Sequence, residues 1–338
     1  MDAAIRLFQR HRSPIFLAAC VILLVAVEVL SGFKPLQLSV TEMTIRMTIV
    51  IGLYVFIGNS GILSFGHVGF VCIGAYAAGW AAADPNWKQL MLTGLPELLR
   101  DRSYPFWAAE LCAIMLPVAV ALVLGVAIMR LRGIAASIAT FAFLMVVQSL
   151  YSNWDSVTAG SSSLARLPTV VGPWLGLAFA ITAIAVAYLF QISRHGVLLR
   201  ASRADDIAAK ASAVRIVRER TIAFVLSAAI VGAGGGLYAQ FLGSMTVRQF
   251  FLEMTFVTLA MLVIGGITSL SGAVVGVVFV TFVVEFLRFL EHGVAISTIK
   301  FALPPGSQEI GLGLAMALIL ILRPAGLMRG RELLDRAR

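Results

Sequence analysis

Residues 47–83, MTIVIGLYVFIGNSGILSFGHVGFVCIGAYAAGWAAA, form a stretch of 37 residues without a charged side chain. As one continuous helix this stretch would be about 55 Å long, whereas the hydrocarbon core of a membrane is about 30 Å thick. It is therefore too long for one crossing and nearly long enough for two. Glycines and small polar residues gather in its middle, at GNSGILSFGH (residues 58–67), and predict a helix break between two crossings.

The composition of the whole chain agrees with a membrane protein. Of its 338 residues 60% are hydrophobic and 13% are charged, and the mean hydropathy is +0.95. An ordinary soluble domain carries about 25% charged residues, so a soluble enzyme is excluded. No polar stretch is long enough for a separate extramembrane domain, and residues 1–338 are predicted to form one transmembrane domain. Cys20, Cys72 and Cys112 lie inside apolar runs, where they are expected to be small core residues.

The other apolar runs predict eight further crossings, which gives about ten in all and an all-α, polytopic helical bundle in the membrane. Only 31 residues separate Glu253 from Glu285, so a short or re-entrant helix remains an alternative there. The eight runs are residues 14–32, 106–129, 133–151, 172–192, 221–242, 250–265, 270–290 and 309–322.

The distribution of basic residues predicts the orientation of the chain. Lys and Arg concentrate in the cytoplasmic loops of membrane proteins. With the N-terminus inside and ten crossings, the inner segments hold 17 of the 26 Lys and Arg residues and the outer loops hold seven. Both termini are therefore predicted to be cytoplasmic. The net charge of +9 is explained by topology, without a nucleic-acid partner.

The longest inner segment is residues 193–220, SRHGVLLRASRADDIAAKASAVRIVRER. Strong helix formers predict a short helix over residues 204–214, with Asp205 and Asp206 in its first turn, where carboxylates suit the positive helix end. Two roles fit this amphipathic helix: contact with anionic lipid headgroups through its basic side chains, or docking into a groove of a soluble partner. Its apolar face would consist of Ile207, Ala208, Ala211 and Val214.

Four stretches, in order along the chain, resemble the permease subunits of ATP-binding-cassette importers for branched-chain amino acids, the LivM type. The likeness extends from about residue 48 to residue 327. The stretches are GNSGILSFGHVGFVCIGAYAA (58–78); LRGIAASIATFAF (131–143) with NWDSVTAGSSSL (153–164); SRHGVLLRASRADDIAAKASAV (193–214) with TIAFVLSAAIVGAGGGLYAQ (221–240); and GGITSLSGAVVGVV (265–278) with RPAGL (323–327).

The resemblance implies a permease fold like that of type II importers, in the inner (plasma) membrane of a bacterium. It implies four kinds of partner: a homologous permease of the LivH type, two cytoplasmic ATP-binding subunits, a periplasmic or lipid-anchored solute-binding protein, and the surrounding lipids. The substrate would be a branched-chain amino acid, although the family also includes permeases for urea, short amides and aromatic acids. The chain departs from the family pattern at Ala159, Ser163 and Ala213, where glycines are usual, and at His195, where an aromatic residue is usual.

The chain lacks a nucleotide site of its own. A phosphate-binding loop needs Gly-Lys followed by Ser or Thr, and none of the four lysines follows Gly or precedes Ser or Thr. The chain is therefore predicted not to be an enzyme, with no cofactor of its own and with ATP and magnesium held by the partner ATPases. The residues 193–220 would form the coupling loop for these subunits. Its candidate contacts are Arg194, Gly196, Asp205, Asp206, Ala208, Ala209 and Ala213.

The glycine-rich breaks are the candidate translocation path, because broken helices at bilayer depth often flank a substrate route. Close helix packing through small residues is the alternative. A lone histidine such as His67 is more typical of an interhelical hydrogen bond than of a proton carrier, and no metal site is predicted. The path candidates are Asn59, Ser60, Gly61, Ser64, Gly66, His67, Gly265, Gly266 and Ser269.

Two further features complete the sequence-based hypothesis. Thr158 and Gly160 match the family's outer loop and would face the binding protein or the mouth of the path, unless this is an ordinary surface loop. Glu285 is an intramembrane acid with Arg288 one turn later, so a self-neutralising pair is favoured over an ion-coupling site. The leading function is transport of a small neutral or zwitterionic solute by alternating access. An ion-driven secondary transporter is the alternative.

Overall fold

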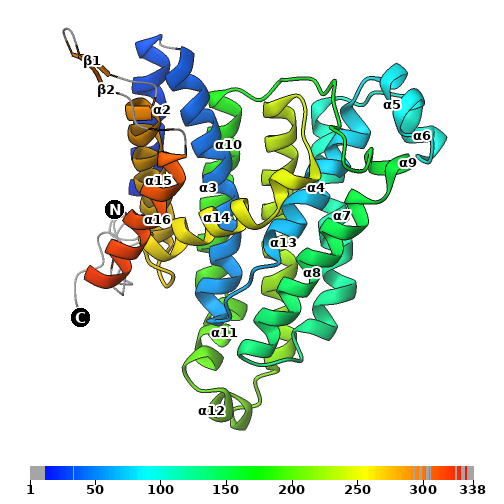
Figure 1. Cartoon of the computed structure of the whole chain (residues 1–338). Helices are drawn as coiled ribbons and strands as arrows, with labels where there is room; N and C mark the ends of the chain where they lie inside the picture. The colour runs from blue at the N-terminus through cyan, green and yellow to red at the C-terminus, as the bar shows by residue number, and fades with distance from the viewer. Residues whose placement is uncertain are drawn as a thin grey trace, which may run out of the picture.

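The computed structural model describes residues 12–32, 34–291, 294–296, 299–301, 304, 306–323, 326–328 and 332. Ten apolar helices make up most of this part of the chain (Figure 1). They are α2 (Arg12–Ser31), α3 (Lys34–Ser60), α4 (His67–Ala82), α7 (Phe106–Ile128), α8 (Ile134–Ser152), α10 (Pro173–Ile192), α13 (Ile216–Leu242), α14 (Leu252–Gly265), α15 (Leu270–Glu291) and α16 (Ser307–Leu322). Shorter elements connect them: α5 (Pro85–Met91), α6 (Glu97–Arg100), α9 (Asp155–Thr158), α11 (Arg194–Ala204), α12 (Asp206–Ala211), the 3-10 helix Val247–Phe250, and strands β1 (Val294–Ile296) and β2 (Ile299–Phe301).

A helix lies at each predicted crossing. Within the described residues seven helical segments are long and apolar enough to cross a membrane, namely those that contain α3, α7, α8, α10, α13, α14 and α15. The apolar stretches of α2 and α4 are shorter, Ile15–Leu30 and His67–Ala82, and α16 has 16 residues. The helical membrane fold is confirmed, whereas the count of ten crossings stays a prediction. The basic residues before Arg12 that entered the orientation argument lie outside the described residues.

One described departure from the all-α prediction is the small antiparallel hairpin of β1 and β2. Val294 pairs with Phe301 and Ile296 with Ile299. The hairpin follows α15, and β-branched residues in both strands favour extended backbone over helix.

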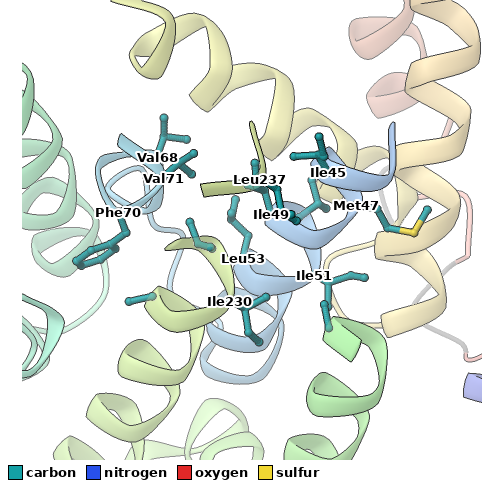
Figure 2. Packing of buried hydrophobic residues seen from close by; sticks show 14 of the residues in the cluster. Ile45, Met47, Ile49, Ile51, Leu53, Val68, Phe70, Val71, Ile230 and Leu237 are labelled. Atoms are coloured by element: carbon teal, nitrogen blue, oxygen red, sulfur yellow. The ribbon is translucent and has the colours of Figure 1, made fainter. Parts of the chain in front are cut away.

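Helices α3, α4 and α13 form the centre of the bundle. The apolar window of α3 is 89% buried, whereas that of α7 is 22% buried, so α7 lies at the periphery. Ile49 and Leu53 of α3, Phe70 of α4 and Leu237 of α13 belong to one buried cluster (Figure 2). This centre carries the glycine-rich break that the sequence singled out.

Glycines allow the central helices to approach closely. A Cβ atom on Gly74 of α4 would overlap the backbone of Gly232 on α13, and a Cβ on Gly235 would overlap the carbonyl oxygen of Val71. Small residues at helix contacts let backbones pack directly against each other in membranes. The glycines of GAGGG at residues 232–236 therefore let α3, α4 and α7 all pack closely against α13.

The short polar elements lie at opposite ends of the bundle. Figure 1 shows α5, α6 and α9 at one end and α11 and α12 at the other. At the first end Lys88 is fully buried, and its Nζ donates to the carbonyl oxygens of Trp80, Leu99 and Arg102 at 3.1, 2.6 and 2.6 Å. Burial lowers the pKa of Lys88, and nearby Asp84 and Asp101 counteract this shift. Lys88 thus ties the α5–α6 loop to the end of α4.

Two acids within the apolar helices have different surroundings. Glu285 accepts a hydrogen bond from Arg288 at 2.9 Å, which confirms the predicted i,i+3 pair. Glu110 on α7 is 2% exposed, and neither of its carboxylate oxygens has a hydrogen-bond partner among the described residues. Its carboxylate lies against Gly236 of α13.

Candidate functional site

The predicted helix break lies between α3 and α4. Helix α3 ends at Ser60, and α4 begins at His67 after a short irregular segment. Gly61 has a φ of +73°, a conformation that favours glycine, and its N–H donates to Ile57 O at 2.9 Å. The break that was predicted from composition alone is therefore confirmed. Whether it lines a translocation path stays a prediction.

The polar side chains of the break are buried inside the chain. Asn59 is 0% exposed; its Nδ2 donates to Val55 O at 3.0 Å, whereas its Oδ1 has no partner among the described residues. Ser60 Oγ accepts from the N–H of Ile62 at 3.2 Å. A buried amide oxygen without a partner is costly in a folded protein. Asn59 Oδ1 is thus a buried hydrogen-bonding group of the break that no described residue uses.

His67 begins α4 and is 1% exposed. Its Nδ1 lies 2.7 Å from Ser64 Oγ, and its Nε2 has no partner in the described part of the chain. Phe56, Phe70 and Phe224 surround the ring at centroid distances of 5.4, 6.1 and 5.5 Å. The hydrogen bond is local to the break rather than between helices. The described residues contain no group of three or more potential metal ligands.

The two predicted path segments meet in space. Helix α14 ends at Gly265, and Gly266, with a φ of +125°, turns the chain toward α15. A Cβ on Gly58 of α3 would lie 2.8 Å from Ile267 O in this turn. The turn is closely packed, because a Cβ on Gly265 would overlap Gly272 O, and Ser269 Oγ accepts from the N–H of Gly272 at 3.0 Å. Residues about 200 positions apart in the sequence therefore form one glycine-rich region.

Arg203 connects this region to the predicted coupling loop. It lies at the end of α11, and its Nη1 donates to Gly58 O in the last turn of α3 at 2.6 Å. A Cβ on Gly61 would lie 2.9 Å from Arg203 Cγ. A cation near the carbonyl end of a helix is stabilised by the free carbonyls and the helix dipole. Sequence analysis placed Arg203 only within the coupling loop, residues 193–220, and missed this link.

Gly66 shows that packing also acts at the break. A Cβ on Gly66 would overlap Thr140 O of α8. Thr140 is itself buried, and its Oγ1 donates to Ser137 O within α8. The close approach of α8 explains this glycine without any solute. Gly66 therefore has a packing role, and a path role for the other residues of the break stays a prediction.

The C-terminal segment caps the α14–α15 turn. The carboxylate of Glu332 accepts from the N–H groups of Leu270 and Ser271 at 2.8 and 3.0 Å. Leu327 N–H donates to Ile264 O at 2.8 Å. A carboxylate at a helix N-terminus satisfies free N–H groups and the helix dipole. Sequence analysis did not find this cap, because Glu332 lies 61 residues beyond Ser271.

The predicted coupling loop contains two helices rather than one. The sequence predicted a helix over residues 204–214, and the structure gives α11 and the shorter α12. Asp205 ends α11 and caps α12, accepting from Ile207 N–H at 2.8 Å and Ala208 N–H at 3.0 Å. The helix breaks at Asp205 because this side chain competes for the backbone N–H groups of the next turn.

The candidate coupling residues divide into exposed and inward-facing groups. Ile207 is 82% exposed and Ala208 is also exposed, whereas Ala209 is 6% exposed and faces the chain's own interior. Asp206 binds Arg220 of α13 at 3.0 Å, which holds α12 against the bundle. A partner would therefore meet Ile207 and Ala208, and Ala209 is unavailable to it in this arrangement.

The remaining coupling candidates shape the start and end of the loop. Arg194 begins α11 and is exposed. Gly196 is buried, its N–H donates to Ser193 Oγ at 3.2 Å, and a Cβ on it would overlap Phe190 O. Ala213 is in the left-handed region, with a φ of +59°. His195 Nδ1 lies 2.6 Å from Glu219 Oε2, so the residue that replaces the expected aromatic contacts the first turn of α13.

The outer-loop candidates make local contacts. Thr158 is fully buried, and its Oγ1 lies 2.6 Å from Tyr151 O and 2.8 Å from Trp154 O. Gly160 has a φ of +55°, and a Cβ on it would overlap Asp155 Oδ1. These residues shape the turn after α9. Their contact with a binding protein stays a prediction.

Together the helices define a polytopic helical membrane protein with a glycine-rich break at its centre and a two-helix polar loop at one end. The family model described as "Branched-chain amino acid transport system / permease component" matches residues 36–322, and the chain belongs to this family. The resemblance inferred from the four sequence stretches is confirmed.

Two curated relatives show how far the likeness extends. The chain is 27% identical to the high-affinity branched-chain amino acid transport system permease protein LivM of Escherichia coli (strain K12). It is 26% identical to the LivM protein of Salmonella typhimurium. Each alignment covers 94% of this chain and 75% of the relative. No solved structure was found to match.

Proposed function

We propose that this chain is the membrane-spanning subunit of an ATP-binding-cassette importer that carries branched-chain amino acids across the bacterial inner membrane by alternating access. The family match and the names of the curated relatives support the class and the substrate. ATP and magnesium would be held by two cytoplasmic ATPase subunits. A homologous permease of the LivH type and a periplasmic or lipid-anchored binding protein would complete the complex.

The proposed mechanism rests on the contact between the coupling loop, residues 193–220, and the helix break at residues 58–67. Helix α12 offers an exposed face, α11 directly precedes it in the chain, and Arg203 of α11 donates to Gly58 O at the end of α3. Movement of α12 by an ATPase would therefore reach the centre of the bundle through one rigid helix. Alternating access requires such a connection between the site of ATP hydrolysis and the barrier to the solute.

Transport in proteoliposomes tests this function. With the full set of partner subunits, uptake of radiolabelled leucine should require ATP and the binding protein, and it should persist when an ionophore collapses ion gradients. Uptake that continues without ATP and stops with the ionophore would contradict the proposal and favour an ion-driven transporter. Competition by valine, urea and phenylalanine separates the substrate classes, and we expect valine to compete most strongly.

A substitution on α12 tests the docking face. Ala208→Glu adds a charge to an exposed position, so we expect the ATPase to be lost on co-purification while the chain still inserts in the membrane. Lys210→Glu is the matched control, because Lys210 is also exposed on α12 but lies outside the assigned face. Normal co-purification of Ala208→Glu would contradict the assigned face. Ala209→Glu is unsuitable, because Ala209 is buried and the change would disturb folding.

A further inference from the structure

An apolar groove runs along the outside of the bundle, between the peripheral helix α7 and the central helix α13. Its volume is about 780 Å³. Most of its lining side chains are apolar and are exposed or half-buried in this chain. Arg215 and Arg218, at the beginning of α13, are also part of the lining. The apolar residues are Val118, Leu122, Val126, Val217, Ile222, Val225, Leu226 and Ala229.

The groove has one charged end and one apolar end. On α13 the positions Arg215, Arg218, Ile222 and Val225 recur every three or four residues, so they share one face. The lining continues to Ala229, about 21 Å along the helix from Arg215. One leaflet of a bilayer contributes about 15 Å of hydrocarbon. The groove is therefore long enough for the hydrocarbon chain of a lipid in one leaflet, and its two arginines lie together at one end.

Arg215 and Arg218 form no salt bridge with an acidic side chain in the part of the chain that the structure describes. Among the described residues, the carboxylates near this end are engaged elsewhere: Glu219 contacts His195 at 2.6 Å, and Asp206 binds Arg220 at 3.0 Å. Neither Arg215 nor Arg218 forms a salt bridge with any described residue. The first turn of α13 adds the positive end of a helix dipole. This end of the groove therefore concentrates positive charge that faces outward.

We propose that the groove is a binding site for an anionic phospholipid, with the phosphate at Arg215 and Arg218 and an acyl chain between α7 and α13. Two arginines beside free helix N–H groups suit a phosphate, and apolar walls suit hydrocarbon. The predicted orientation places this end at the cytoplasmic leaflet, which carries anionic lipids. A bound lipid would hold α7 beside α13, next to the segment that connects α13 with α12. The site goes beyond the proposed function and does not depend on the solute carried.

Native mass spectrometry of the full chain tests the site. The chain is purified in neutral detergent and offered equal amounts of phosphatidylglycerol and phosphatidylcholine. We expect the wild type to retain phosphatidylglycerol preferentially and Arg215→Gln/Arg218→Gln to lose this preference by roughly tenfold or more. The matched control is Lys210→Gln/Arg132→Gln, which removes two exposed charges outside the groove and should keep the preference. Equal binding of both lipids by the wild type, or an unchanged preference in the groove variant, would overturn the proposal.

A second variant separates lipid binding from a subunit interface. Leu122→Trp fills the groove without adding charge, so it should reduce retention of phosphatidylglycerol while the chain still assembles with its partner subunits. Assembly that fails in Leu122→Trp, with lipid retention unchanged, would reassign the groove to contact with another permease chain and overturn the lipid site. Displacement of the bound lipid by inorganic phosphate alone would also overturn it, because the acyl chain would then contribute nothing.

Discussion

At the scale of single residues, two alanines occupy backbone conformations that favour glycine. Ala159 has a φ of +61° and Ala213 a φ of +59°. Both are positions where the resemblance to the family leads us to expect glycine. The left-handed conformation costs an L-residue about 1–2 kcal/mol, because the Cβ crowds the following carbonyl. The sequence identifies the two positions, and the backbone angles place both alanines in the conformation that carries this free-energy cost.

We therefore predict that Ala213→Gly stabilises the protein. The gain should be about 0.5–1 kcal/mol after the extra flexibility of glycine in the unfolded chain is subtracted. The measurement is the apparent melting temperature in detergent, which should rise for Ala213→Gly and for Ala159→Gly. Ala208→Gly is the control, because Ala208 lies within α12, where glycine lowers stability. Equal decreases for Ala213→Gly and Ala208→Gly would contradict the strained backbone.

Asn59 allows a test of the path against packing. Its Oδ1 is buried without a partner in the described residues, so Asn59→Ala removes an oxygen that no described residue uses, together with the local hydrogen bond from Nδ2 to Val55 O. If the break lines the path, the ratio of leucine to valine uptake should change, while expression and melting temperature stay close to those of the wild type.

Asn153→Ala is the matched control for Asn59→Ala. Asn153 Nδ2 also donates to the carbonyl four residues before it, Ser149 O, but Asn153 is exposed at the far end of α8. The control should leave the uptake ratio unchanged. An unchanged ratio in Asn59→Ala as well would assign the break to packing alone.

At the scale of elements, α11 is the connection between the exposed helix α12 and the broken helix α3. The sequence indicated a helix in this loop and a break in residues 58–67. It gave no indication that the two meet, because Arg203 and Gly58 are 145 residues apart. The capping of α15 by Glu332 is a second contact of this kind. Periodicity and composition report on local structure only, so such contacts appear only when the helices are packed.

The Arg203 contact predicts a specific defect. Arg203→Gln removes a charge-assisted hydrogen bond, worth about 1.5–3 kcal/mol, between α11 and α3. We expect a complex that still assembles and hydrolyses ATP, but with leucine uptake per ATP lowered about tenfold or more. The measurement is the ratio of uptake to phosphate release in proteoliposomes.

Arg200→Gln is the control for this prediction. Arg200 lies on the same helix and donates to Gln191 O at 2.8 Å, so the charge removed is the same but the contact with α3 remains. Its ratio of uptake to ATP hydrolysis should be close to that of the wild type. An equal loss in both variants would show that the charge of α11 matters rather than the contact.

At the scale of the whole molecule, the polar elements divide between the two ends of the bundle. The sequence assigned residues 84–105 to the outside and residues 193–220 to the cytoplasm. In the structure α5 and α6 lie at the opposite end from α11 and α12 (Figure 1). This arrangement is consistent with the distribution of Lys and Arg along the chain. Only that distribution indicates which end of the bundle lies in the cytoplasm.

Cysteine labelling tests this orientation in cells. In a background in which Cys20, Cys72 and Cys112 are replaced by alanine, a cysteine is introduced by Glu97→Cys or by Ile207→Cys. A membrane-impermeant maleimide should label Glu97→Cys in intact spheroplasts and Ile207→Cys only after the membrane is opened. Labelling in the reverse order would invert the topology and place the proposed ATPase contact outside the cell.

The sequence by itself determined the membrane class, the positions of the apolar helices, the break at residues 58–67 and the family. These properties depend on local hydrophobicity, on glycines that interrupt it and on short motifs that can be recognised in the sequence without the tertiary structure. Only the tertiary structure decided that Gly58 lies against Ile267, that Arg203 caps α3 and that Ala209 faces inward. These properties depend on how helices far apart in the chain pack together, and close packing through glycines brings them into contact.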